Sequence, residues 1–528
     1  MTRNNLDKNW RLCAGAITVA AAVLAISSYG ARAQDEAPTN APVTGRINVE
    51  SATAVDLQSA PALVGAAAPA GVNYNRPTPN IAHGGAAPSF RSQGGAPESP
   101  SSALALWAQT PSLNETSFGG FPPDGDIATS VLYSVQVNNF AVTIFNTAPR
   151  TIAKQVNFAT FFSDSANFLF DPRVIYDPTW QRFVVMADGC NGGCPSGAQV
   201  SFLDVAISKT SNPTGAYWIY HFGPGTGTGD FADFPQMGMD LNSIIFTFND
   251  FLAGGGFDAK TFAVAKAYLY NGLGFSVPIF GGSSCTIAPP YVLDNGGPSY
   301  TLVACPGDNG VYLGPMTNSG LSNVSVQHWQ AKVATAAFGS VPCAPQPIVS
   351  YCLDTGDSRF ENRSAQIGSR IWNVHTVQDG TATPRWYEFD TGASTQVGSG
   401  IWFATGTSSD WHPSIIVNGV GAVAPNPTGE TFGTWMSVDA TNNRNLQLRA
   451  IGGSFDNAGA GAGIPVSPLS AQPLTNQTFN GNRSGDYSYI SLWPRAIGAC
   501  AANEFAVLEG EVSLGPNWGT VLGIVKHC

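Results

Sequence analysis

The chain has 528 residues and a formal net charge of −11, and only 11% of its residues are charged. An acidic chain without a basic run lacks the positive surface that neutralises phosphates, which excludes a nucleic-acid partner. Glycine is abundant, with 59 residues. This composition is typical of a secreted all-β protein in which turns join many short strands.

The first 33 residues have the three parts of an export signal. Arg3 and Lys8 lie in a basic start, residues 12–26 are almost entirely apolar, and Ala31-Arg32-Ala33 fits a signal peptidase site. The apolar run, about 15 residues, is too short to span a bilayer comfortably, although a retained anchor is the alternative. We predict a signal peptide over residues 1–33, no membrane span after its removal, and a secreted or periplasmic location.

Residues 34–102 are rich in Ala, Pro, Gly and Ser and have no strand or helix periodicity. We predict a disordered or extended linker. It is either a spacer that holds the folded part away from a surface or a tolerated tail. The folded domain is predicted over residues 103–528.

Nine cysteines are present, and Cys13 lies in the predicted signal peptide. An even number of remaining cysteines in an exported chain indicates disulfides. A metal site at Cys190 and Cys194 is the less favoured alternative, because no second Cys or His pair has ligand spacing. Neighbouring cysteines flank turns or short loops, so we predict four local pairs: Cys190–Cys194, Cys285–Cys305, Cys343–Cys352 and Cys500–Cys528.

A hairpin over residues 171–186 sets a pattern for the rest of the chain. An Asp precedes an apolar strand, a turn follows at Asp177-Pro178, and a second apolar strand returns. Similar units follow at intervals of roughly 60 residues, and imperfect repeats of three or four strands indicate a β-propeller. The other units start near Asp126, Asp233, Ala288, Ser364, Trp411 and Gly485.

We therefore predict an all-β propeller of four-stranded antiparallel sheets, with seven blades favoured and six allowed. One blade cannot bury both faces of its sheet, so the blades must stack around an axis. The last unit supplies about three strands, and we expect a strand within residues 104–118 to complete it and cover its open edge.

Three short motifs carry a resemblance: Asp171–Asp177, Asp233-Phe234-Pro235 and Gly485-Asp486-Tyr487. On these motifs, residues 118–525 resemble secreted bacterial β-propeller proteins with sialidase-like repeats. The sialidase Asp-box, Ser-x-Asp-x-Gly-x-x-Trp, is not matched. The resemblance implies the propeller fold and says little about activity.

In a propeller, the starts of the repeated units converge on one face, so their polar residues are predicted to meet. Asn362-Arg363-Ser364 and Asn482-Arg483-Ser484 also resemble each other. Three arginines can clamp a carboxylate, as sialidases do with their acidic sugar, although pairing of each Arg with a nearby Asp is favoured. The candidate ligand-binding residues are Arg173, Arg363, Arg483, Asp126, Asp233, His412 and Asp486.

A sialidase-like reaction would need a Tyr nucleophile with a carboxylate partner. Tyr487, Glu361 and Asp171 are the candidates by position. Several carboxylates facing one channel could also bind Ca²⁺. A role in fixing the turns between blades is favoured, so no cofactor is predicted and Ca²⁺ is left open.

The leading hypothesis is a monomeric binding or adhesion scaffold for a carbohydrate or a cell-surface protein. The alternative is a glycan-active hydrolase or lyase with its site at the channel mouth, and whether the protein is an enzyme is left open. A third possibility, a structural protein, would have its channel plugged by side chains. Arginines that point into one solvent-filled pocket would favour an enzyme, and arginines held in ion pairs between blades would not.

Overall fold

The computed structural model describes residues 40–61, 104–114, 122–148, 150–191, 200–419, 429–475, 484–498 and 500–528. The predicted signal peptide, Cys194 and Arg483 lie outside these ranges. Across the described ranges, we find no helix that is both long and apolar enough to cross a membrane.

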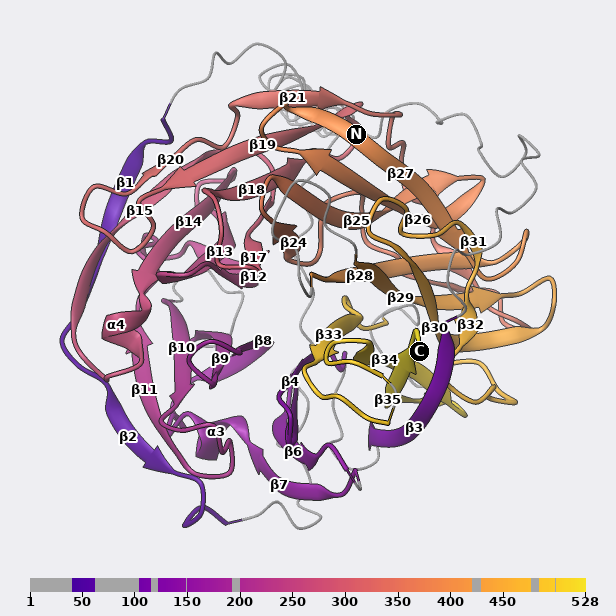
Figure 1. The fold of residues 1–528 in the computed structure, drawn as a ribbon, viewed down its shortest axis with the longest axis horizontal. Coiled ribbons are helices and arrows are strands. Elements are labelled where there is room, and N and C mark those ends of the chain that lie inside the picture. Colours follow the sequence, from indigo (N-terminus) through magenta and orange to yellow (C-terminus); the bar gives the residue numbers. More distant parts are fainter. Residues whose placement is uncertain are drawn as a thin grey trace, which may run out of the picture.

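From β4 onward, the strand units follow one another in chain order around a central axis, and the whole is an all-β propeller (Figure 1). Short helices occur at Phe158–Phe161 (α3) and Lys266–Leu269 (α4). Within the described residues, five separate sheets of four or five strands form blades.

The five blades follow the chain, and each is antiparallel. The first contains β4 (Asp126–Thr129), β5 (Tyr133–Asn138), β6 (Ala141–Asn146) and β7 (Ile152–Asn157). The second contains β8 (Phe168–Asp177), β9 (Arg182–Cys190), β10 (Ser201–Ser208), β11 (Ala216–Phe222) and β2 (Thr53–Asp56). The third contains β16 (Ile287–Ala288), β18 (Ser299–Ala304), β19 (Gly310–Thr317), β20 (Ser325–Val326) and β21 (Ala331–Ala334). The fourth contains β28 (Ser409–Asn418), β29 (Glu430–Asp439), β30 (Arg444–Ser454) and β32 (Ile464–Pro465). The fifth contains β33 (Tyr489–Trp493), β34 (Phe505–Leu514), β35 (Asn517–Lys526) and β3 (Ala105–Asn114).

The favoured count of seven blades is wrong, and so is the allowed count of six. Two four-stranded antiparallel units are joined in one 11-stranded sheet, because β17 (Pro290–Val292) pairs in parallel with a strand of each. The first unit contains β12 (Phe231–Met239), β13 (Ser243–Phe251), β14 (Phe257–Ala265) and β15 (Phe275–Ser283). The second contains β24 (Ser364–Ile367), β25 (Arg370–Asp379), β26 (Thr381–Asp390) and β27 (Thr395–Phe403), extended by β31 (Gly461–Ala462). A separate two-stranded sheet contains β22 (Ala344–Pro345) and β23 (Cys352–Leu353).

Strands from the start of the described chain cover three sheet edges. β3 pairs antiparallel with β35 near the C-terminus, which confirms the predicted closing strand. β1 (Val43–Val49) pairs with β15, and β2 pairs with β11. The linker prediction is wrong for these two segments. They form strands because exposed sheet edges offer them hydrogen-bond partners, and this is not visible in their own composition.

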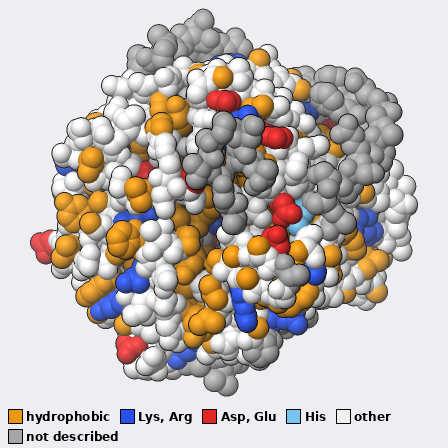
Figure 2. Space-filling view, in the orientation of Figure 1, with side chains coloured by type: hydrophobic (Ala, Val, Ile, Leu, Met, Phe, Trp, Pro, Cys, Tyr) orange, Lys and Arg blue, Asp and Glu red, His pale blue; other side chains and the backbone are white. Residues whose placement is uncertain are grey.

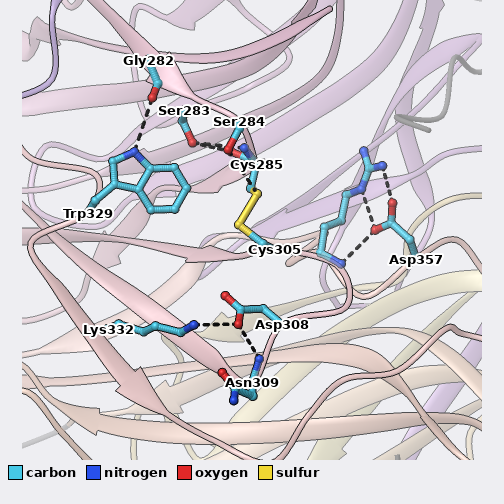
Figure 3. The surroundings of a disulfide bond; sticks show 11 residues. Gly282, Ser283, Ser284, Cys285, Cys305, Asp308, Asn309, Trp329, Lys332 and Asp357 are labelled. Atoms are coloured by element: carbon cyan, nitrogen blue, oxygen red, sulfur yellow. Dashed lines mark hydrogen bonds and ion pairs between the residues drawn. A yellow bond between two sulfur atoms is a disulfide. The ribbon is translucent and has the colours of Figure 1, made fainter. Parts of the chain in front are cut away.

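Three of the predicted disulfides are confirmed: Cys285–Cys305, Cys343–Cys352 and Cys500–Cys528. Cys190 is also disulfide-bonded, while its predicted partner lies outside the described residues. Figure 3 shows Cys285–Cys305 near Trp329, whose indole N–H donates to the Gly282 carbonyl oxygen at 3.4 Å.

The core lies between neighbouring blades. One cluster joins Val135 and Val142 of the first blade to Val174 and Val185 of the second, and all four are fully buried. Apolar side chains therefore fill the space between sheets, while the polar side chains of the inner strands meet near the axis.

Candidate functional site

Three inner strands share a bulge at a residue that precedes proline. Asp171, Phe234 and His412 have φ angles of 46°, 57° and 49°, and the pairing register shifts at each of them. Positive φ is uncommon for side chains of this size, and a bulge redirects the side chain. Asp171 and Phe234 consequently both reach Tyr487: the Asp171 carboxylate accepts its hydroxyl hydrogen bond at 2.8 Å, and the aromatic rings lie 5.3 Å apart.

Arg173 links three inner strands at the axis. Its Nε donates to the Pro235 carbonyl oxygen at 2.6 Å. Its guanidinium carbon lies 3.6 Å from the ring centre of Tyr487 and 5.3 Å from that of Tyr489. The side chain is 1% exposed. Arg173 is therefore a buried cation that packs between blades at the centre of the propeller.

Arg363 is held by the carboxylate of Asp126. Arg363 Nη1 donates to Asp126 Oδ2 at 2.8 Å, and Nη2 donates to Oδ1 at 3.3 Å. The same Oδ2 accepts the backbone N–H of Val174 at 2.9 Å. For this arginine, the structure shows the ion pair between units that sequence reasoning favoured.

His412 and Glu361 form a second buried pair, with 2.8 Å between Nδ1 and Oε1. The His412 backbone N–H donates to Thr376 Oγ1. A Cβ at Gly356 would lie 2.8 Å from Glu361 Oε1, so the absence of a side chain there leaves room for the pair. Glu361 thus meets His412, while the hydroxyl of Tyr487 donates to Asp171.

The remaining predicted residues are also buried near the starts of the units. The backbone N–H of Asp486 donates to Asp124 Oδ1 at 2.6 Å. Asp233 lies in the bulged segment of β12 and is 2% exposed. The structure therefore gathers Asp171, Arg173, Asp233 and Tyr487 in one charged, buried cluster, which we call the axial cluster.

Burial sets the protonation of the axial cluster. It raises the pKa of Asp171 to about 7, with a further rise from Asp233 that Arg173 partly offsets. Burial, followed by the charge of Asp171, also raises the pKa of Tyr487 well above its usual range. Tyr487 is therefore a neutral hydrogen-bond donor at physiological pH.

Sequence reasoning missed Asp188 on β9. It is fully buried, and neither of its carboxylate oxygens has a hydrogen-bond partner among the described residues. Burial, then the charges of Asp233 and Asp171, raise its pKa well above the usual range. The signal in the sequence is one acidic residue in the otherwise apolar run that begins at Phe183.

A cavity of about 150 Å³ lies at the other end of the inner strands. Its wall comes from β4, β8, β17, β24, β28 and β33, so it lies on the axis of the ring. It combines aromatic and aliphatic groups with a cation and a carboxylate, and it includes the exposed residues Pro178 and Asp294. The lining residues used below are Tyr176, Tyr291, Asp294, Arg363, Ile416 and Leu492.

Arg363 connects the axial cavity to the buried ion pair, because it lines the cavity and binds Asp126. Tyr291 is fixed at the wall by donating its hydroxyl to the Tyr176 carbonyl oxygen at 2.5 Å. On the face seen in Figure 2, hydrophobic and uncharged groups make up most of the described surface, and Asp and Glu groups lie near the centre. The cavity lining itself is mostly apolar, with one cation and one carboxylate, and suits a polar ligand with apolar faces better than a highly charged one.

No family model matches the chain, and no curated protein matches it. Solved structures that are similar include an exo-beta-1,3-galactanase from Phanerochaete chrysosporium (11% identity, 80% of this chain, 100% of that chain, TM-score 0.31). Another is a Trypanosoma rangeli sialidase mutant (12% identity, 73% of this chain, 57% of that chain, TM-score 0.33). A third is the WD40 domain of SCAP from fission yeast (9% identity, 75% of this chain, 82% of that chain, TM-score 0.29). At these TM-scores the matches add nothing to the topology described above.

Proposed function

We propose that this protein is an exported β-propeller scaffold that binds a carbohydrate at the axial cavity. The observation that carries the proposal is the cavity itself, where Arg363, Asp294 and two tyrosines meet aliphatic side chains from several blades. Small-ligand sites combine mostly apolar walls with a few fixed polar groups in this way.

The polar groups of the cavity suit the hydroxyl groups of a sugar. The Arg363 guanidinium has five N–H donors. Hydrogen bonds from Nη1 and Nη2 to Asp126 fix its position and leave donors for a ligand oxygen. Asp294 supplies an acceptor at the exposed side, and the rings of Tyr176 and Tyr291 supply apolar surface for the C–H face of a sugar.

An enzymatic role as a glycan hydrolase or lyase is the alternative. It would require a substrate to reach Tyr487 or the neighbouring carboxylates. Tyr487 is 1% exposed, donates to Asp171, and has a raised pKa that disfavours the phenolate. Arg363 is engaged by Asp126. These contacts support binding over catalysis.

Three disulfides support a location outside the cytoplasm, because such bonds persist in oxidising compartments. We therefore propose that the protein is secreted or periplasmic and acts as a monomer. Its ligand is a carbohydrate, free or carried by a surface protein.

A glycan array followed by titration of the best glycan tests the proposal. Leu492→Trp should fill the cavity and weaken binding by about 10-fold or more, because a ring would occupy the space of the ligand. Leu273→Trp is the matched control, since Leu273 is 51% exposed and lies outside the cavity lining.

Equal binding by Leu492→Trp and the unaltered protein would contradict the proposal, and so would an array without any bound glycan. Circular dichroism would verify that both variants fold. A hydrolase and lyase substrate panel on the unaltered protein and Tyr487→Phe tests the alternative. Turnover that is lost in Tyr487→Phe would replace the binding proposal with the enzymatic one.

A further inference from the structure

The outer part of the second blade carries a cluster of two carboxylates and a histidine that lies apart from the axial cavity. Asp204 of β10 and His221 of β11 are directly paired across the two strands. Paired residues of an antiparallel sheet project their side chains on the same face. His221 Nδ1 accordingly lies 2.5 Å from Asp204 Oδ1 and 3.6 Å from Asp164 Oδ2.

Asp164 is held in place by its own turn. Its Oδ1 accepts the backbone N–H groups of Ala166 and Asn167, and its Oδ2 accepts the Asn167 amide at 2.7 Å. The turn follows α3, where Phe161 packs edge-on against Tyr217 of β11 with 5.0 Å between ring centres. The connection between the first two blades thus presents Asp164 to the other two side chains.

One of the two carboxylate oxygens of Asp204 is unbonded within the described part of the chain. Its side chain is 1% exposed, and Oδ2 has no hydrogen-bond partner among the described residues. Leaving a buried charged group incompletely bonded is costly. This buried, unbonded oxygen is a second observation that favours a cation ligand role for Asp204.

We propose that Asp164, Asp204 and His221 bind a divalent transition-metal ion, with Zn²⁺ the preferred ion. One ligand atom from each of the three residues lies within 4.8 Å of the others. An imidazole nitrogen with two carboxylate oxygens is a donor set that Zn²⁺ accepts, and three protein ligands leave a position for water. The metal takes the place of the proton between His221 and Asp204.

The position of the cluster suits an ion that enters from solvent. The His221 side chain is 42% exposed, whereas Asp204 is buried behind it. Bound metal would connect the segment between the first two blades to the outer strands of the second blade. An ion that binds the folded state alone raises the stability of that state.

Isothermal titration calorimetry with ZnCl₂ on the untagged, EDTA-treated protein tests the site, with CaCl₂ as the comparison ion. We expect one saturable Zn²⁺ equivalent, a preference for Zn²⁺ over Ca²⁺, and a rise in melting temperature with Zn²⁺. His221→Gln and Asp204→Asn should each weaken Zn²⁺ binding by about 10-fold or more, because each removes one of three ligands. Asp308→Asn, which removes a carboxylate from another surface ion pair, should leave the Zn²⁺ affinity unchanged.

Co²⁺ absorption provides a second measurement that does not depend on variant stability. Visible bands of a low-coordinate Co²⁺ complex in the unaltered protein, displaced by Zn²⁺, would support the site. Zn²⁺ binding that is undetectable, or equal in His221→Gln and the unaltered protein, would overturn it and leave an ion pair alone.

Discussion

The axis and the rim of this propeller use charged residues in opposite ways. At the axis, Arg173 is 1% exposed and packs on Tyr487. At the rim, the side chains of Lys332 and Asp308 are 29% and 10% exposed and meet at 2.7 Å (Figure 3). Burial makes the axial contacts strongly interdependent, while water screens the rim pair. The axial contacts thus hold the blades together, whereas this rim pair contributes little.

Replacing Arg173 should produce the largest effect. Arg173→Met leaves the carboxylate of Asp171 without its nearby cation and removes the hydrogen bond to Pro235. We expect the free energy of unfolding, measured in urea, to fall by about 3–5 kcal/mol. Lys332→Met, its control at the rim, should change that free energy by less than about 1 kcal/mol. Similar losses in both variants would contradict the difference between axis and rim.

Loss of a disulfide should rank second. Cys285 and Cys305 are separated by 20 residues, and the bond restricts the unfolded chain. The double Cys→Ser variant should lose about 3 kcal/mol of unfolding free energy under non-reducing conditions. The pair Cys343 and Cys352, separated by 9 residues, should lose slightly less, about 2.5 kcal/mol. A reversed order of these two losses would show that native contacts outweigh loop length.

The pH dependence of stability gives the third prediction, with an effect per pH unit that is smaller than the losses above. Burial raises the pKa of Glu509 from 4.5 to about 8, so the folded state binds this proton more tightly than the unfolded state. Its contribution to stability is fully present below the unfolded pKa and is lost as the pH rises towards 8. Urea unfolding at pH 5 to 8.5 should show a decline of up to about 1.4 kcal/mol per pH unit for each such group. Glu509→Gln should flatten this decline, and an unchanged slope would contradict the assignment.

Local sequence patterns predicted the elements whose partners are near in the chain. The three confirmed disulfides each close a hairpin or a short loop, so symmetric placement about a turn was sufficient to pair them. The starts of the units were also recognisable, because an acidic or small residue precedes an apolar run. Their bulges and positive φ angles were not predicted, although a proline follows each bulged residue.

Contacts between distant segments could not be predicted in this way. Asp126 and Arg363 are far apart in the chain and meet only when the ring closes. Asp204 and His221 become neighbours through strand register, which depends on the whole second blade. The short strand β17 changed the blade count because its pairing with two units depends on their placement in space.

The sequence by itself determined an all-β chain of repeated antiparallel units, three local disulfides, and several of the polar residues near the axis. These follow from side-chain alternation, turn chemistry and spacing, which act over a few residues. Tertiary structure alone decided that Asp171, Arg173 and Tyr487 are buried, and that the cavity lies at the opposite end of the inner strands. Burial and cavities depend on how the blades pack around the axis, and that packing combines contacts from the whole chain.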